Sequence, residues 1–264
     1  MEKYIQNKNV LIFVDEKIVE NSTKAILLIH GFAEHGGRYK DFIFRLNEQG
    51  YSVFAMDLRG HGKTRGKKGD MESIEKVITD VEIVMDYIRE NYNFEKVGIF
   101  GHSTGGLVTS LFTSLNNNKV DFIILSSPAI YCPKKLKIIN FIPYNLAKFI
   151  YIKKRRSESK EMLEYSKKDE YSLHKFSLRC IGVIFKEGVR LHNKILNIQC
   201  PALLVCGKKD KLLNESNKFE DLSKKLKNVK NKFILYEDAK HRIVHNEGSE
   251  ERIQDILNWL KELY

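Results

Sequence analysis

The chain has 264 residues, 42% of them hydrophobic, and a formal net charge of +11 at pH 7. This length suits one α/β domain with an insertion or two small domains, and the apolar content excludes a largely disordered chain. No apolar run approaches the roughly 20 residues that span a bilayer, and Met1–Lys8 contains no apolar signal segment. We therefore expect a cytoplasmic protein.

Strands and helices are predicted to alternate along most of the chain. Continuous apolar runs predict strands covered on both faces, and apolar residues three and four apart predict helices. In chain order, the predicted elements are a hairpin of Val10–Val14 and Lys17–Glu20 around Asp15-Glu16, strand Ala25–His30, helix Tyr39–Gln49, strand Tyr51–Leu58, helix Ile74–Asn91, strand Lys96–Gly101, helix Leu107–Leu115, strand Val120–Leu125, strand Pro201–Val205, helix Glu215–Leu226, strand Lys232–Tyr236 and helix Glu250–Leu263. This alternation predicts the α/β class, with a mostly parallel, doubly wound sheet whose sites lie beyond the carboxyl ends of its strands.

The interval Tyr131–Asn197 interrupts the alternation. Between Tyr131 and Gln199 there are 16 Lys and Arg against 6 Asp and Glu, so almost all of the net charge lies in this interval. Its pattern is helical, and its place between two strands predicts a lid over the carboxyl edge of the sheet. The expected organisation is an α/β core of residues 1–130 and 198–264 with a helical lid of residues 131–197.

The lid segment has two open interpretations. The run Leu136–Ile152 is rich in apolar residues and is followed by Lys153-Lys154-Arg155-Arg156. It is either an interfacial helix that docks on anionic lipid with its basic residues at the headgroups, or a lid helix that packs on the domain beneath.

Four cysteines bear on redox chemistry and metal binding: Cys132, Cys180, Cys200 and Cys206. Cys200 and Cys206 flank one predicted strand, and an extended chain holds them too far apart to bridge each other. Reduced thiols fit the expected compartment, and no Cys or His spacing resembles a zinc site. We expect no metal.

A Gly-x-Ser-x-Gly motif lies where a strand meets a helix, at Gly101-His102-Ser103-Thr104-Gly105. A serine hydroxyl is a weak nucleophile until a base takes its proton. Gly101 and Gly105 permit the sharp turn of a nucleophile elbow, which lifts the serine above the carboxyl end of the strand at a helix N-terminus. Ser103 is therefore the candidate nucleophile, provided that the chain supplies a base, an acid and an oxyanion hole.

Asp210 and His241 follow two later strands, in the chain order Ser, acid, His that this kind of elbow uses. Taken singly, Asp210 is more simply interpreted as a turn or helix-capping carboxylate, and His241 as a loop histidine. Both nevertheless follow strands whose carboxyl ends share the edge of Ser103. This coincidence favours a catalytic triad of Ser103, Asp210 and His241.

An oxyanion hole requires two backbone N–H groups aimed at the developing negative charge. One is expected from Thr104, directly after the nucleophile, and the other from Phe32, in the loop after Ala25–His30. Three further histidines lie in motif turns, and we expect them to hydrogen-bond loops rather than to transfer protons: His30, His61 and His102.

Taken together, these motifs resemble the monoacylglycerol lipase and lysophospholipase branch of the α/β-hydrolases, which is also described as serine aminopeptidase-like. The resemblance covers nearly the whole chain, and its most specific part is the segment His30–Tyr39. The matching segments are His30-Gly31-Phe32-Ala33-Glu34-His35-Gly36-Gly37-Arg38-Tyr39, Asp57-Leu58-Arg59-Gly60-His61-Gly62, Gly101-His102-Ser103-Thr104-Gly105-Gly106, Gly207 with Asp210, and His241.

This resemblance implies serine hydrolysis of single-chain acyl esters, without a cofactor, under a mobile lid. It also implies that Arg38 and Glu34 contribute to the polar end of the substrate pocket, with a structural salt bridge as the alternative. Two positions depart from the family pattern. Thr104 stands where Met is usual, which preserves the N–H but changes the pocket wall. The family often has a second histidine three residues after the catalytic one, near the glycerol, and His245, four residues after His241, is the candidate for this substrate contact.

Three functions remain to be compared. The first is a carboxylic-ester hydrolase that cleaves monoacylglycerol or a similar lipid through an acyl-enzyme. The second is a lysophospholipase, because an anionic phosphate head would suit the basic lid. The third is a basic lipid- or nucleic-acid-binding protein on a hydrolase scaffold. The complete triad argues against the third, so we expect a small lipid ester as partner, with transient membrane contact through the lid and no nucleic acid.

Overall fold

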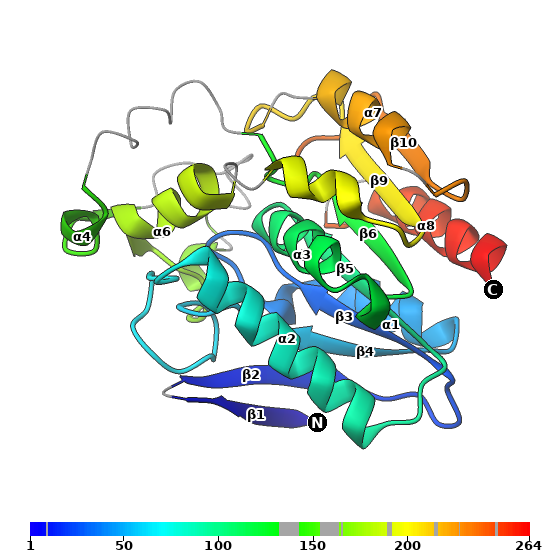
Figure 1. Ribbon diagram of the computed structural model, residues 1–264, viewed down its shortest axis with the longest axis horizontal. Helices are drawn as coiled ribbons and strands as arrows, with labels where there is room; N and C mark the ends of the chain where they lie inside the picture. The colour runs from blue at the N-terminus through cyan, green and yellow to red at the C-terminus, as the bar shows by residue number, and fades with distance from the viewer. Residues whose placement is uncertain are drawn as a thin grey trace.

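An eight-stranded sheet forms the centre of the protein, described here from a computed structural model (Figure 1). The structure describes residues 1–8, 10–131, 143–153, 164, 166–188, 192–213, 216–226, 228–245 and 248–264. The strands are β1 (Glu2–Asn7), β2 (Val10–Lys17), β3 (Lys24–Ile29), β4 (Tyr51–Met56), β5 (Lys96–His102), β6 (Phe122–Ser126), β9 (Ala202–Gly207) and β10 (Lys232–Tyr236). They lie in the order β1-β2-β4-β3-β5-β6-β9-β10, and every pair from β4 to β10 is parallel. The mostly parallel sheet predicted from the sequence is therefore confirmed.

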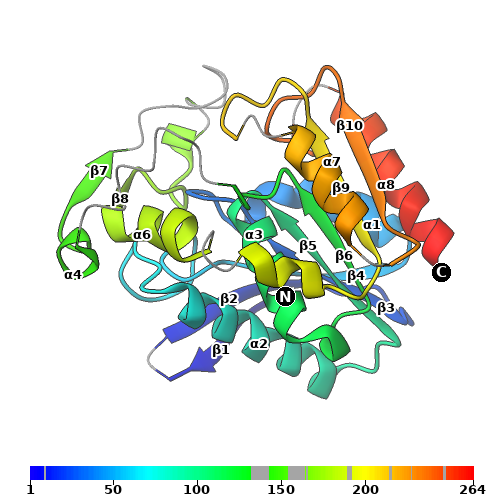
Figure 2. The same ribbon diagram turned by 45° about the horizontal axis from the view of Figure 1, so that its top comes forward.

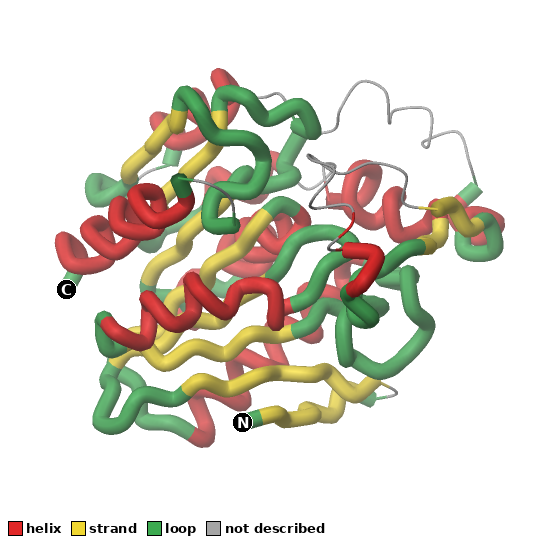
Figure 3. The backbone as a smooth tube through the Cα atoms, turned by 180° about the vertical axis from the view of Figure 1, so that it is seen from behind, coloured by secondary structure: helices red, strands yellow, loops and turns green. Residues whose placement is uncertain are grey.

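Helices cover both faces of this sheet, as a doubly wound arrangement requires. The main helices are α1 (Lys40–Glu48), α2 (Ile74–Asn91), α3 (Thr104–Leu115), α7 (Ser216–Lys225) and α8 (Ser249–Leu263). Helices α2, α3 and α7 lie on the face nearer the viewer in Figure 1, and their apolar residues form one core with the sheet. Helices α1 and α8 form a second core on the opposite face, which Figure 3 shows from behind.

Three central strands, β4, β6 and β9, are buried along their whole length because both of their faces are covered. All six residues of β4 and of β9 are buried, and so are all five residues of β6. The helices owe their bounds to local signals as well as to packing. Helix α2 has the predicted bounds, its first turn is capped by the Ser73 side chain, and its apolar residues at helical spacing are buried.

The predicted hairpin around Asp15-Glu16 was wrong. Strand β2 continues through these residues to Lys17, and it pairs with β1 on one side and with β4 on the other. The physical reason is that Glu16 is a buried partner rather than a turn residue: its carboxylate accepts hydrogen bonds from the hydroxyls of Tyr87, at 2.8 Å, and Tyr92, at 3.1 Å. The chain instead reverses after β1, where Lys8 has a left-handed φ of 46°.

The insertion, residues 131–197, leaves the sheet after β6 and returns to it before β9. Its described elements are α4 (Tyr144–Ala147), β7 (Tyr151–Lys153), β8 (Lys175–Ser177), α6 (Leu178–Gly182), a π-helical turn η4 (Val183–Gly188) and a 3-10 helix η5 (His192–Asn197). Strands β7 and β8 pair antiparallel, so the described part of the insertion is not helical throughout. Much of the predicted run Leu136–Ile152, and all of Lys154-Arg155-Arg156, lie outside the described residues.

Figure 2 shows that α4, β7 and α6 lie to one side of the sheet, whereas η5 packs against α3. Ion pairs fix the insertion to loops at the carboxyl edge. Asp169 accepts hydrogen bonds from Arg38 Nε at 2.8 Å and from His35 at 3.0 Å, and Arg179 donates from Nε to Asp70 at 2.9 Å. The described insertion therefore touches the loops that follow β3 and β4.

Two further features concern thiols and membranes. Cys180, Cys200 and Cys206 are free thiols, and Cys132 lies outside the described residues. Within the described ranges, no helix combines the length and the apolar character of a membrane span.

The contact between Asp169 and Arg38 predicts a pH-dependent contribution to stability. Partial burial raises the pKa of Asp169, but hydrogen bonds from Arg38, Ser172 and His35 outweigh it and bring the pKa down to about 2. Because this folded-state pKa is depressed, the stabilisation is complete above the ordinary value near 3.8 and is lost as the pH falls towards 2.

We therefore expect Asp169→Asn to lower the free energy of unfolding at pH 7 by about 2 kcal/mol, since a hydrogen-bonded charge is removed and Arg38 stays buried. The difference between the two free energies of unfolding should shrink as the pH falls from 4 to 3. Urea unfolding at several pH values measures this difference. Glu170→Gln, at an exposed neighbouring carboxylate, is the control. A difference that does not change with pH would contradict this prediction.

Candidate active site

Ser103 lies at a sharp turn between β5 and α3, and its backbone has φ 52° and ψ −113°. A non-glycine residue rarely adopts this conformation, and holding it there costs of order 1–3 kcal/mol. Neighbouring backbone holds it: the N–H of Ser103 donates to Ser126 O at 2.9 Å, and the carbonyl of Ser103 accepts from Ala129 N at 2.8 Å. The turn therefore has the geometry of a nucleophile elbow.

Two glycines make this turn possible, as predicted. A Cβ on Gly101 would lie 2.5 Å from the carbonyl oxygen of Gly105, and a Cβ on Gly105 would lie 2.1 Å from the carbonyl oxygen of Ile29. Any side chain at Gly105 would thus push α3 away from β3. The close approach sets the N-terminus of α3 directly against the sheet edge.

The structure brings Ser103, His241 and Asp210 together. His241 Nε2 lies 2.9 Å from Ser103 Oγ, and His241 Nδ1 lies 2.7 Å from Asp210 Oδ2. All three side chains are buried, and they follow the carboxyl ends of β5, β9 and β10. This chain of contacts joins a hydroxyl, an imidazole and a carboxylate in the order that general-base catalysis needs.

Asp210 keeps its charge in this buried place. Burial raises its pKa, but the hydrogen bond and charge of His241, together with the backbone N–H groups of Leu212 and Leu213, lower it further, so that the pKa lies below its ordinary value. The two N–H groups donate to Oδ1 at 2.8 and 3.1 Å, which leaves Oδ2 for the imidazole. An ionised carboxylate here orients the ring and favours a positive charge on it.

Phe32 and Thr104, the two predicted oxyanion-hole donors, lie in the loop after β3 and at the start of α3. Thr104 is the first residue of α3, and N–H groups in a first helical turn have no acceptor within the helix. Phe32 lies beyond the ladder of β3, which ends at Ile29. The preceding Gly31 lies close to Ser103, since a Cβ on Gly31 would lie only 3.2 Å from Ser103 Cβ.

The three candidate substrate-binding residues, Arg38, Glu34 and His245, each have a different contact in the structure. Arg38 pairs with Asp169 of the insertion. Glu34 is fully buried and pairs with Arg242, while the ring of His245 packs edge-on against Tyr39 with 4.2 Å between ring centroids. Arg38 and Glu34 thus form salt bridges, but with other partners than each other.

Three residues at this site were not singled out from the sequence: Arg242, Tyr39 and Asp169. Arg242 directly follows His241, so its place in the chain was a usable signal. Tyr39 lay within the motif His30–Tyr39 and carried no specific role. Nothing in the local sequence links Asp169 to this site, because Arg38 and His35, its partners there, are more than a hundred residues away.

The histidines of the motif turns hydrogen-bond loops in the structure. Burial lowers the pKa of His30 to about 4 and of His61 to about 3, and it takes the pKa of His102 well below the ordinary range. His30 Nε2 accepts from Leu58 N at 3.0 Å, and His102 Nδ1 lies 3.1 Å from Ser126 O. These rings are neutral at pH 7.

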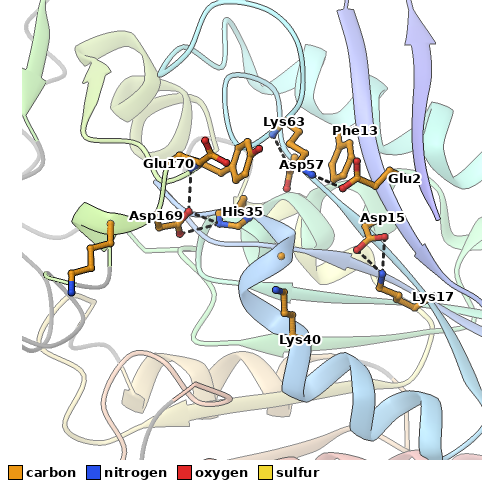
Figure 4. Close-up of a pocket in the computed structure, with 13 residues that line it drawn as sticks. Glu2, Phe13, Asp15, Lys17, His35, Lys40, Asp57, Lys63, Asp169 and Glu170 are labelled. Atoms are coloured by element: carbon orange, nitrogen blue, oxygen red, sulfur yellow. Dashed lines mark hydrogen bonds and ion pairs between the residues drawn. The ribbon is translucent and has the colours of Figure 1, made fainter.

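A separate polar cavity of about 640 Å³ opens between the β1–β2 hairpin, the start of α1 and the insertion (Figure 4). Figure 4 shows Asp169 and His35 on one wall, with Asp15 and Lys17 on another. Ser103, Asp210 and His241 are not among its lining residues. Among the residues with described positions, no group of three or more His, Cys, Asp or Glu side chains is arranged to hold a metal ion.

Comparison with known proteins assigns the chain to a family. Residues 20–248 match the family described as "Serine aminopeptidase, S33". The chain belongs to this family. The family and the names of its relatives place the chain among hydrolases of the lipase and esterase type.

The relatives differ in how much of their length they share with this chain. The monoglyceride lipase of Rattus norvegicus is 25% identical over 254 residues, which cover 90% of this chain and 82% of that protein. An uncharacterized abhydrolase domain-containing protein of Dictyostelium discoideum is 28% identical over 90% of this chain, but this chain spans only 26% of its length.

Solved structures show the same fold. The monoacylglycerol lipase of Paleococcus ferrophilus has a TM-score of 0.81 at 24% identity, over 96% of this chain and 99% of that chain. A soluble variant of the monoglyceride lipase of Saccharomyces cerevisiae, in complex with a substrate analog, has a TM-score of 0.82 at 23% identity, over 99% of this chain and 94% of that chain. The α/β-hydrolase fold expected from the sequence is thereby confirmed.

Proposed function

We propose that the protein is a serine ester hydrolase whose triad is Ser103, His241 and Asp210. The observation that carries the proposal is the chain of contacts from Ser103 Oγ through His241 to Asp210, at 2.9 and 2.7 Å, on a strained elbow. Membership of a hydrolase family supports it.

The proposed reaction proceeds through an acyl-enzyme. Ser103 Oγ attacks the ester carbonyl while His241 Nε2 takes its proton and then returns it to the leaving alcohol. Asp210 stabilises the imidazolium that forms, and the N–H groups of Phe32 and Thr104 bind the oxyanion. Water then attacks the acyl-enzyme while His241 takes its proton. His241 returns this proton to Ser103 Oγ, and the carboxylic acid is released.

The proposed substrate is a monoacylglycerol or a similar single-chain ester, which the names of the relatives support. A lysophospholipid is the second candidate, because the interval from Tyr131 to Gln199 carries 16 basic against 6 acidic residues and would favour a phosphate head. Parallel turnover of monoacylglycerols, lysophosphatidylcholine and short synthetic esters separates the two.

The insertion is proposed to act as a lid that also contacts membranes. Its described tip exposes five large apolar side chains, Leu146, Phe149, Ile150, Tyr151 and Ile152, of which Phe149 is 69% exposed. Lys148 lies 4.8 Å from the Phe149 ring and Lys67 lies 5.2 Å from the Tyr151 ring. Apolar side chains bordered by lysines are typical of contact with an anionic lipid surface.

Ser103→Ala should abolish esterase activity, because its hydroxyl makes the covalent bond and contributes little packing. Loss of a triad nucleophile costs on the order of a millionfold in kcat, so turnover above about one percent of the parent would remove Ser103 from this role. The melting temperature should change little. A fluorophosphonate probe should label the parent and not the variant, whereas an unlabelled parent would favour a non-enzymatic binding protein.

His241→Ala should be similarly inactive, while His245→Ala should mainly raise KM, as loss of a ground-state contact would. His245→Ala is a suitable comparison for His241→Ala because both imidazoles lie near the ring of His102. The distance between ring centroids is 4.9 Å for His241 and 6.3 Å for His245. Steady-state kinetics on one soluble ester measures both. The reverse result would show that the general base was wrongly assigned.

The double variant Phe149→Ser, Ile150→Ser should sediment less with anionic vesicles, because it removes apolar surface from the tip of the insertion. The double variant Lys148→Gln, Lys153→Gln should weaken binding by about 2 kcal/mol at low salt and reduce its salt sensitivity. Phe44→Ser, at a similarly exposed phenylalanine on α1, is the control. Equal vesicle binding by all variants would favour a lid that only packs on the core.

A further inference from the structure

The buried carboxylate of Glu34 joins the two loops that carry the oxyanion donor and the general base. Glu34 Oε1 accepts the N–H of Gly31 at 2.8 Å and the hydroxyl of Tyr39 at 2.6 Å, while Oε2 forms an ion pair with Arg242 Nη1. The Glu34 side chain is 1% exposed and that of Arg242 is 12% exposed. One carboxylate thus ties together the loop after β3, the start of α1 and the loop after β10.

Both ends of this connection lie next to reacting groups. Gly31 directly precedes Phe32, and Arg242 directly follows His241. In the sheet, β3 and β10 are separated by β5, β6 and β9, so no ladder hydrogen bond fixes one loop relative to the other. The ion pair spans this gap directly.

Glu34 carries a negative charge in this position. Burial raises its pKa, but Arg242, the nearby His102 and His245, and the hydrogen bond from Tyr39 together hold the pKa well below its ordinary range. A buried carboxylate is costly unless it is paired and hydrogen-bonded, and here both of its oxygens have partners. Oε1 contacts the loop after β3 and the start of α1, whereas Oε2 contacts the loop after β10. A shift of either loop would therefore break at least one of these contacts.

We infer that Glu34 and Arg242 are positioning residues, whose ion pair sets the place of His241 relative to the N–H of Phe32. This inference rests on the proposed function, because it assigns the pair to the acylation step. In that step the base must reach Ser103 Oγ while the oxyanion donor faces the carbonyl oxygen, and a misplacement of about 1 Å can cost on the order of a hundredfold in rate. It gives Glu34 a role other than the substrate contact implied by the sequence.

The test compares kcat and KM on a soluble ester for Arg242→Gln, Glu34→Gln and the double variant. Each single variant should lower kcat by roughly 10- to 100-fold with little change in KM. The double variant should lose little more than the worse single variant, because the two side chains act as a unit. Arg242→Lys, which keeps the charge without the fork geometry, should recover part of the rate.

Arg252→Gln is the matched control. Arg252 is a buried arginine of α8, and it pairs at 3.0 Å with Asp238 on the connection between β10 and α8 that also carries Arg242. Melting temperatures of all variants separate a loss of folded protein from a loss of rate. If Arg242→Gln does not fold, the kcat values of Arg242→Lys and Glu34→Gln, each divided by that of the parent, decide the question.

Several outcomes would overturn the inference. An unchanged kcat with a raised KM would make the pair a substrate contact. A loss equal to that of Arg252→Gln, or additive losses in the double variant, would make it a general stabilising pair. Fluorophosphonate labelling separates this inference from the proposed function. An unlabelled parent would contradict the proposed function. If Arg242→Gln is labelled as fast as the parent, only the positioning role is contradicted.

Discussion

The left-handed backbone of Ser103 is the constraint on which the rest of the site depends. It turns the chain from β5 into α3 within one residue, and it can persist only because the sheet and the following helix hold it from both sides. Gly101 and Gly105 are required by the same turn, since any side chain there would collide with backbone. The conformation thus places the Ser103 hydroxyl beyond the carboxyl end of β5, within 2.9 Å of His241 Nε2.

The other parts of the site follow from the topology of that sheet. Parallel strands end at one edge, so the loops after β3, β5, β9 and β10 meet there although they are far apart in the chain. The sheet aligns the strand ends, but the loops need contacts of their own to fix their relative positions. Asp210 with His241 provides one such contact, and Glu34 with Arg242 provides another.

The sequence allowed the fold and the proposed triad to be predicted because both depend on local patterns. Apolar runs gave the buried strands, and the elbow motif, Asp210 and His241 each follow one of them. The prediction failed where a distant partner decides the structure. Glu16 looked like part of a turn because its partners, Tyr87 and Tyr92, are over seventy residues away. The contact between Arg38 and the insertion was equally hidden, since Asp169 is 131 residues distant.

Burial and hydrogen bonding also distinguish the histidines around Ser103 from one another. Around Ser103, the rings of His30, His102 and His245 are buried with lowered pKa values and stay neutral at pH 7. None of these three has the arrangement of His241, whose two nitrogens face a carboxylate on one side and the Ser103 hydroxyl on the other. A carboxylate hydrogen-bonded to an imidazole stabilises a positive charge on the ring, so the placement of Asp210 supports the proposal that His241 is the histidine that accepts the proton of Ser103.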